Sequence, residues 1–416
     1  MPAIAGYSMQ PTLTRTAASL ASIVGLRMFG LFLILPVFAI YGQELEGATP
    51  SLIGLAIGIY GLTQALLQIP LGMVSDRVGR RPVIFAGLLL FLLGSVVAAL
   101  SDHIVGVILG RALQGAGAIS AVVMALAADL TPPERRTRIM AAIGMSVGAA
   151  FMLALMLGPV IASWAGLSGL FWTTALLALA AMVSLVTVVP SSRGHQVQSS
   201  SPRLRGLLHV LRNADLMRLN LAVGVLHFVL TGAFLAVPLM LADGMGLAVD
   251  DHWKVYIPVL LLSVLLLVPA IGFGERTGRQ RLVLVMALLL LTLVLTSQSL
   301  VPAGFGFLVT LWLFFSAFNV LEASLPSLVS RYGPNAERGA ALGVYGTSQF
   351  GGAFLGGVLG GVVLGAYGTA GVFLLCAVAA LLGLGFSLKL GPVPGGSSKE
   401  PAKAAEACES DVNRLK

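Results

Sequence analysis

Charged side chains are scarce in this sequence, since Asp, Glu, Lys and Arg together make up 10% of its 416 residues. A water-soluble protein has about a quarter of its residues charged, so this composition excludes a large soluble domain. Long polar segments are also scarce. Apolar runs of about 20 residues, the length that crosses a bilayer as a helix, recur along the chain instead. With a mean hydropathy of +0.96, the sequence predicts an all-α polytopic membrane protein.

Cysteine is nearly absent, with Cys376 in an apolar run and Cys408 in the polar C-terminal segment. Two cysteines in such different surroundings predict neither a disulfide framework nor a metal site. The sequence also lacks a Walker phosphate loop, an HExxH zinc motif and a nucleophile elbow. We therefore expect a protein that is not an enzyme, holds no cofactor or metal, and has no domain to hydrolyse ATP.

Apolar periodicity places twelve transmembrane helices in the chain. They are expected at 17–42, 50–75, 82–101, 103–130, 136–163, 167–190, 217–243, 252–274, 281–300, 304–331, 335–366 and 368–390. The one long polar stretch divides them into an N-terminal six-helix bundle (1–190), a cytoplasmic linker (191–216) and a C-terminal six-helix bundle (217–390). Residues 391–416, rich in Pro, Gly, Ser, Ala, Glu and Lys, are expected to form a disordered cytoplasmic tail.

The basic residues are distributed very unequally between the two sides of this arrangement. Of the 25 Lys and Arg residues, Lys254 alone falls on one side, and Arg27 and Arg111 fall inside helices. All the others lie on the side of the linker and of both termini. Positive charge marks the cytoplasmic side, so we expect both termini in the cytoplasm and the protein in a bacterial inner membrane. The basic balance is thus a topology signal, and no nucleic-acid partner is expected.

A charged turn follows the second helix. The segment from Gly72 to Pro82 reads G-M-V-S-D-R-V-G-R-R-P and must lie at a membrane surface, because hydrocarbon does not tolerate its charges. Its pattern G-x-x-x-D-R-x-G-R-R resembles motif A of the major facilitator superfamily of transporters. After the eighth helix, the segment Glu275 to Arg279 repeats part of this pattern, as expected for two related halves.

Other segments extend the resemblance over most of the chain. The fourth helix reads G-R-A-L-Q-G-A-G from Gly110 to Gly117, which is similar to motif B. Gly158 and Pro159 resemble part of motif C of the drug:proton antiporters, although two alanines stand where glycines are expected. The runs L-R-M-F-G, at 26–30, and F-N-V-L-E-A, at 318–323, are most similar to the YajR-type branch. This resemblance implies two pseudo-symmetric six-helix bundles with a substrate site between them near the bilayer midplane.

The resemblance also implies a gate at the charged turn. Gly72 would let the second helix approach the eleventh closely, and Asp76 would face the N-terminus of that helix. Arg80 would pair with Asp129. The gate residues are expected to be Gly72, Asp76, Arg77, Gly79, Arg80, Arg81 and Asp129, with Arg77 and Arg81 also able to meet lipid phosphates. The alternative is that the turn only anchors the chain at the positive side of the membrane.

Charges inside the predicted helices are functional candidates, because burying them is costly. Glu322 lies roughly 14 Å from the cytoplasmic end of the tenth helix, at 1.5 Å per residue. Desolvation raises and a nearby arginine lowers a carboxylate pKa, so Glu322 is a candidate proton carrier. A static Glu–Arg pair and a direct substrate ligand are the alternatives. Arg27, Arg111 and His227 are the other proton-coupling candidates; the lone histidine more often only hydrogen-bonds a neighbour.

Polar side chains on the second, tenth and eleventh helices are candidates for the substrate cavity. They are Tyr60, Gln64, Gln68, Asn319 and Gln349. The alternative is that they form hydrogen bonds between helices. Taken together, the sequence predicts a monomeric secondary transporter that exchanges a small amphiphilic molecule for protons. Its other expected partners are the membrane lipids around it. Proton symport or uniport of a metabolite, and a non-transporting sensor or scaffold, remain as alternatives.

Overall fold

The computed structural model describes residues 11–131, 133–189, 204–333 and 338–393. Within these ranges the regular structure is helical, apart from one isolated bridge between Glu46 and His103. The helices are α1 (Pro11–Phe32), α2 (Phe38–Tyr41), α3 (Pro50–Val78), α4 (Arg80–Ala99), α5 (Ile104–Ala116), α6 (Ser120–Asp129), α7 (Pro133–Thr187), α8 (Leu204–Arg212), α9 (Ala214–Leu239), α10 (Trp253–Thr277), α11 (Gln280–Leu300), α12 (Phe305–Tyr332) and α13 (Arg338–Ser387).

Nine helices in the described ranges are long and apolar enough to cross a membrane, and Ala18–Phe32 is a shorter apolar helix. Two of the nine, α7 and α13, are each divided by a glycine with positive φ, Gly166 (φ 62°) and Gly368 (φ 65°). These glycines fall where the sequence predicts a boundary between two helices. With α7 and α13 divided there, each of the twelve predicted ranges lies on one helix, one half of a helix, or a pair of short helices.

Two predicted helices are interrupted. The range 103–130 forms α5 and α6, with a break at Gly117, and the range 17–42 forms α1 and α2. At Gly117 the backbone touches α4, because a Cβ there would lie 2.2 Å from the Gly87 carbonyl oxygen. The break leaves the Gly117 carbonyl free of the helix ladder, so it can accept a hydrogen bond from a side chain.

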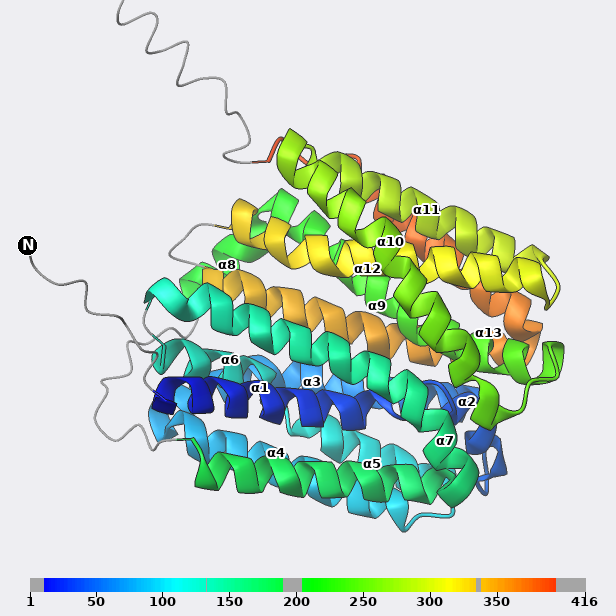
Figure 1. The fold of residues 1–416 in the computed structure, drawn as a ribbon, viewed down its shortest axis with the longest axis horizontal. Helices are drawn as coiled ribbons and strands as arrows, with labels where there is room; N and C mark the ends of the chain where they lie inside the picture. The colour runs from blue at the N-terminus through cyan, green and yellow to red at the C-terminus, as the bar shows by residue number, and fades with distance from the viewer. Residues whose placement is uncertain (1–10, 132, 190–203, 334–337, 394–416) are drawn as a thin grey trace, which may run out of the picture.

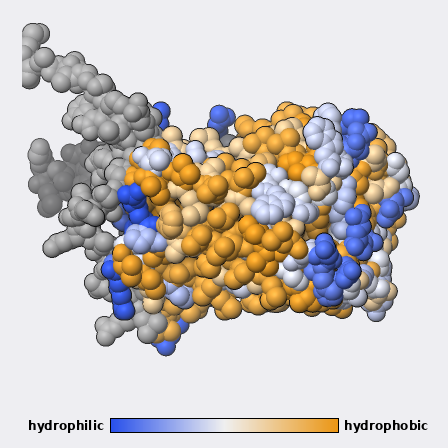
Figure 2. Space-filling model, turned by 90° about the horizontal axis from the view of Figure 1, so that it is seen from below, coloured by the Kyte–Doolittle hydropathy of each residue, from blue (hydrophilic) through white to orange (hydrophobic). Residues whose placement is uncertain are grey.

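The helices form two groups that lie side by side in Figure 1. Helices α1 to α7 form the lower group, and α9 to α13 the upper one. Figure 2 shows a broad apolar belt on the outside, with hydrophilic side chains gathered toward the two ends. Large exposed apolar side chains such as Trp164, Leu176 and Phe305 lie on the outer surface. This distribution suits a bilayer, where apolar surface is stable without water.

The described part of the expected linker forms a short helix, α8. Within the expected linker 191–216, α8 packs against α9 and α13, and its Val210 is fully buried. Helix α9 begins at Ala214, because the Asn213 side chain accepts hydrogen bonds from two backbone N–H groups of its first turn. After α13, the Gly391 N–H donates to Asp215 Oδ1 at 3.1 Å, so the ordered chain extends past the expected boundary at 390.

Helix α13 is the seam between the two groups, since it packs on both α9 and α3. A Cβ on Gly54 of α3 would lie 2.2 Å from the Gly357 carbonyl oxygen, so the two backbones touch there. Further along, Gln68 Nε2 donates to Thr347 Oγ1 at 3.0 Å. No described residue lies within 4 Å of the Cβ position of Gly72. The groups are joined along α3 from the Pro50 end as far as Gln68. Because residues 334–337, at the start of the predicted eleventh helix, lie outside the described ranges, the close approach at Gly72 stays a prediction.

Candidate functional site

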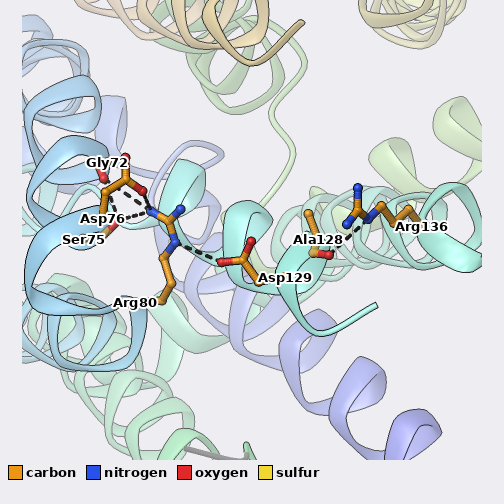
Figure 3. A network of polar contacts seen from close by, with 7 residues as sticks. All are labelled: Gly72, Ser75, Asp76, Arg80, Ala128, Asp129 and Arg136. Atoms are coloured by element: carbon orange, nitrogen blue, oxygen red, sulfur yellow. Dashed lines mark hydrogen bonds and ion pairs between the residues drawn. The ribbon is translucent and has the colours of Figure 1, made fainter. Parts of the chain in front are cut away.

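The charged turn between α3 and α4 holds a compact ion-pair network (Figure 3). Arg80 forms an ion pair with Asp76, and its Nε lies 3.3 Å from Asp129 Oδ2 on α6. Arg80 is 4% exposed, and its guanidinium also donates to Ser75 Oγ and, at 3.4 Å, to the Gly72 carbonyl oxygen. The predicted Arg80–Asp129 contact is confirmed. A buried guanidinium shared by two carboxylates fixes the ends of α3, α4 and α6 relative to one another.

The other residues of the turn have separate roles. Gly79 has φ 105°, a backbone conformation that favours glycine, and it joins α3 to α4 in one residue. Arg77 is exposed. Arg81, expected at lipid phosphates, donates instead to the Leu185 carbonyl oxygen at 3.0 Å and so binds the end of α7. The expected partner of Asp76, the start of the eleventh helix at residues 334–337, lies outside the described residues.

The equivalent turn of the second group is looser. Glu275 at the end of α10 pairs with Arg331 at the end of α12, with 3.1 Å between Oε1 and Nη2. The two side chains are 53% and 37% exposed, against 9% and 4% for Asp76 and Arg80. An exposed pair of this kind contributes about 0–1 kcal/mol. The repeat of the charged turn is thus partial in structure as well as in sequence.

Arg27 lies on α1 in the interior of the first group. It donates to Ser120 Oγ at 2.9 Å, Tyr60 Oη at 2.7 Å, Gln64 Oε1 at 2.6 Å and the Gly117 carbonyl oxygen at 3.2 Å. The last contact uses the carbonyl freed by the break between α5 and α6. Arg27 is 1% exposed, and all these acceptors are neutral.

Arg111 on α5 lies on the Tyr60 ring, with 5.0 Å from its guanidinium carbon to the ring centroid. It donates to the Ala56 carbonyl oxygen at 3.3 Å and to Gln114 Oε1 at 2.7 Å. Like Arg27, it is 1% exposed and bound to neutral acceptors. Among the described contacts, neither arginine pairs with Glu322, so the static Glu–Arg pair is not formed in this conformation.

Glu322 on α12 lies instead beside His227 of α9, with 3.8 Å between Oε2 and Nε2. His227 Nε2 is 2.7 Å from Gln349 Nε2 on α13, and His227 Nδ1 is 3.2 Å from the Val223 carbonyl oxygen. Glu322 Oε2 is buried and has no hydrogen-bond partner, although the side chain as a whole is 39% exposed. The structure therefore gathers two titratable groups and one amide from three helices in the middle of the second group.

An aromatic cluster lies next to this site. Phe318, one turn from Glu322 on α12, is 6.2 Å from the His227 ring. Phe151 of α7 contacts Phe234, Phe315 and Phe318 of the second group, at ring-centroid distances between 6.4 and 6.5 Å. Because Phe151 belongs to the first group, these rings join the two groups across their interface.

The candidate cavity residues all find partners within the protein. Tyr60 and Gln64 belong to the Arg27 network, and Gln68 binds α13. Asn319 Nδ2 donates to Ser263 Oγ of α10 at 2.7 Å, and Gln349 binds His227. In this conformation each of them makes the hydrogen bond between helices that was the alternative, and direct contact with substrate remains a prediction.

Gly158 and Pro159 lie within α7, where that helix meets the segment after α1. A Cβ on Gly158 would lie 2.6 Å from the Leu33 carbonyl oxygen. The glycine is thus required for close packing of α7 at this point, independently of any role in coupling.

Sequence reasoning missed three contributors. Arg136 at the start of α7 donates to the Ala128 carbonyl oxygen at 3.1 Å, beside the Arg80 network (Figure 3). Tyr345 has a buried hydroxyl without a hydrogen-bond partner, in the electrostatic range of Glu322. Its spacing of four residues from Gln349 is a signal that could have placed both on one face of the helix. Nothing in the spacing of Phe151 marks it as a contact between the groups.

The family model of the Major Facilitator Superfamily matches residues 20–274 and 253–411 of the chain. The chain belongs to the major facilitator superfamily. This major facilitator is 44% identical to the inner membrane transport protein YajR of Escherichia coli (strain K12), over 91% of this chain and 84% of that protein. It is 28% identical to the multidrug resistance protein MdtH of Yersinia enterocolitica, over 80% of this chain and 82% of that protein.

Solved structures agree on the fold of this major facilitator. A bacterial homolog of the human lysosomal transporter Spinster, in an inward-facing and occupied conformation, superposes with a TM-score of 0.74 at 15% identity. The match covers 92% of this chain and 97% of that one. The nucleoside transporter NupG (D323A mutant) gives a TM-score of 0.72 at 14% identity, over 90% and 99% of the two chains. The chain is thus a multi-pass membrane protein of a transporter family and not an enzyme.

Proposed function

We propose that this major facilitator exports a small amphiphilic molecule in exchange for protons, by alternating access, from a bacterial inner membrane with both termini in the cytoplasm. The observation that carries the proposal is Glu322, a carboxylate in the middle of a membrane-spanning helix with the titratable His227 beside it. Such a group is costly in a membrane interior and is a functional candidate by default. The relatives of this chain that are named for multidrug resistance favour export of an amphiphilic substrate.

Alternating access is supported by the uneven seam between α3 and α13. The backbones touch at Gly54 and Gly357, and no described residue lies within 4 Å of the Cβ position of Gly72. With the basic end in the cytoplasm, we infer that this conformation is open inward. In the opposite state the Gly72 end would close and the Gly54 end would open. The latch that would hold the cytoplasmic end closed in that state is the contact predicted between Asp76 and the start of the eleventh helix, with Arg80 and Asp129 positioning Asp76. Its size is one that a bound ligand can overcome.

The proton supplies the bias between these two states. We expect Glu322, whose side chain is 39% exposed, to change its surroundings when the two groups rock against each other. A proton shifts the equilibrium only as far as it binds one state better than the other. Arg27 and Arg111 keep the interior of the first group positive, which disfavours a second cation there and leaves Glu322 as the acid that binds the proton. Two groups on one chain form the pathway, so no partner chain is required.

The test is substrate-dependent proton flux by purified protein in proteoliposomes, under opposite pH gradients and with a panel of amphiphiles. We expect flux in the wild type and its loss in Glu322→Gln, which keeps the shape and removes the titratable group. Glu275→Gln is the matched control, since it removes an acid at the surface of the same half. Proton flux that persists unchanged in Glu322→Gln would reject Glu322 as the proton carrier. Proton flux in the same direction as the substrate would indicate symport instead of antiport.

A further inference from the structure

The hydrogen bonds of His227 define the form of its ring. Nδ1 faces the Val223 carbonyl oxygen at 3.2 Å, and a carbonyl only accepts, so Nδ1 carries the hydrogen. Nε2 faces the Gln349 amide nitrogen at 2.7 Å, and an amide nitrogen only donates, so Nε2 accepts. With this orientation of the Gln349 amide, the His227 ring carries its hydrogen on Nδ1 and accepts a hydrogen bond at Nε2 from α13.

Two buried polar atoms next to this bond have no hydrogen-bond partner. One is Glu322 Oε2, at 3.8 Å from His227 Nε2, and the other is the Tyr345 hydroxyl. Tyr345 and Gln349 are one turn apart on α13, and the charge of Glu322 acts on Tyr345. A buried acceptor without a donor is costly, so this arrangement favours one in which Glu322 Oε2 accepts a hydrogen bond from a new donor.

We propose that Gln349 detects the protonation of His227 and transmits it to α13, an inference that rests on the proton-coupled transport proposed above. When Nε2 binds a proton, it becomes a donor and faces the donating Gln349 amide at the same position. The new N–H turns to Glu322 Oε2, which lacks a donor. Gln349 must then release His227 or rotate its amide to present Oε1. One proton is added, and the product is an imidazolium–carboxylate pair.

The backbone around His227 makes this change hard to absorb locally. A Cβ on Gly352 would lie 1.9 Å from the Gly224 carbonyl oxygen, and one on Gly356 would lie 2.2 Å from that of Phe228. Helices α9 and α13 are thus in backbone contact within a turn of the site. Because they touch, the two helices cannot separate to relieve the donor–donor conflict, and any relief beyond rotation of the Gln349 amide falls on the 345–349 segment of α13.

The same segment of α13 holds the seam with the first group. Gln68 of α3 donates to Thr347 Oγ1 at 3.0 Å and to the Gly343 carbonyl oxygen at 3.3 Å. Thr347 is two residues from Gln349, so a change at Gln349 reaches the contact between α3 and α13 without crossing another helix. The titratable groups that face the site are Glu322 from α12 and Tyr345 from α13, and Phe318 closes it with an apolar ring.

The experiment measures how the conformation responds to pH. Spin labels at Val78 on α3 and Leu342 on α13, both exposed, report the separation of the two helices at the Val78 end of α3. In detergent-solubilised full-length protein without substrate, we expect the wild-type distance distribution to change with pH through a single midpoint. Gln349→Leu should remove this pH response while one proton per molecule is still taken up in a pH-jump measurement.

A second variant gives the opposite sign and keeps the test decisive if Gln349→Leu does not fold. Gln349→Glu places a carboxylate against Nε2, which stabilises the protonated ring, so the midpoint should rise by about 1 pH unit or more. The matched control is Gln298→Leu, a buried amide on α11 in the same half with no hydrogen-bond partner, which should leave the midpoint unchanged.

Each outcome separates this inference from the transport proposal. A wild-type pH response retained in Gln349→Leu, or a midpoint that does not rise in Gln349→Glu, overturns the role of Gln349 even if flux remains coupled. A wild type without any pH response also overturns it. Conversely, suppose that Gln349→Leu loses the pH response while substrate flux in the wild type is not coupled to protons. This result would support the role of Gln349 and reject the proposed exchange of substrate for protons.

Discussion

A methyl group on Gly54 should force the two halves apart at the end where they are now joined. In the structure, a Cβ there would lie 2.2 Å from the Gly357 carbonyl oxygen and 2.7 Å from the Gly361 Cα. Both obstacles are backbone atoms, so no side chain can rotate away to make room. Gly54→Ala therefore destabilises this conformation specifically and leaves a state with the Pro50 end open unaffected.

The size of the effect follows from the packing. Inserting a methyl group into a close-packed contact costs about 1–3 kcal/mol. A difference of that size changes the ratio of two conformations by about 5- to 150-fold. The matched variant is Gly72→Ala. Its added Cβ meets no described residue within 4 Å, so we expect no steric cost in this state. It is expected to clash only when the Val78 end of α3 closes on α13.

The assay is the same pair of spin labels at Val78 and Leu342, in a background without Cys376 and Cys408. Gly54→Ala should shift the population toward short distances between the labels, and Gly72→Ala toward long distances. Shifts in the same direction, or no shift in Gly54→Ala with the protein folded, would refute the idea that one seam closes as the other opens.

Three further results are expected. Arg80→Ala leaves Asp76 and the partly buried Asp129 without their shared cation, so it should lower the thermal unfolding temperature in detergent, with a loss of about 3 kcal/mol for a broken buried pair. Glu275→Gln, at the exposed equivalent turn, should change the free energy of unfolding by less than about 1 kcal/mol and so shift the unfolding temperature less than Arg80→Ala does. Phe151→Ala removes the ring that joins the two groups, so it should raise proton leak in proteoliposomes without substrate; unchanged leak would place the barrier elsewhere.

Much of the fold could be predicted because a bilayer imposes strong rules on sequence. Helix length, the position of Gly166 and Gly368 between two apolar runs, and the charged turn all follow from the thickness of the membrane and the cost of charge inside it. The Arg80–Asp129 contact came from the family resemblance. The break at Gly117 was not predicted, since a glycine in an apolar run has the same composition signal whether or not it interrupts a helix.

Partners within the site were harder to predict. A glutamate and two arginines at membrane depth suggest an ion pair, yet Arg27 and Arg111 turn inward to carbonyl, amide and phenol oxygens, and Glu322 lies beside His227. Depth along a helix is a property of sequence, but the side of the helix that meets a particular neighbour depends on its rotation in the packed bundle.

The single glycines that divide α7 and α13 also decide how these helices move. Gly166 and Gly368 have nearly the same backbone angles, φ 62° and ψ −165° against φ 65° and ψ −164°, at equivalent places in the two halves. A one-residue connection adds no flexible segment, so a helix that is displaced along its axis must displace the helix joined to it. Each half therefore contains a rigid pair of helices, joined at one end, that moves as a lever. An epitope tag or protein insertion placed in either joint would uncouple the lever, whereas the longer connection after α9 has the length to accept one.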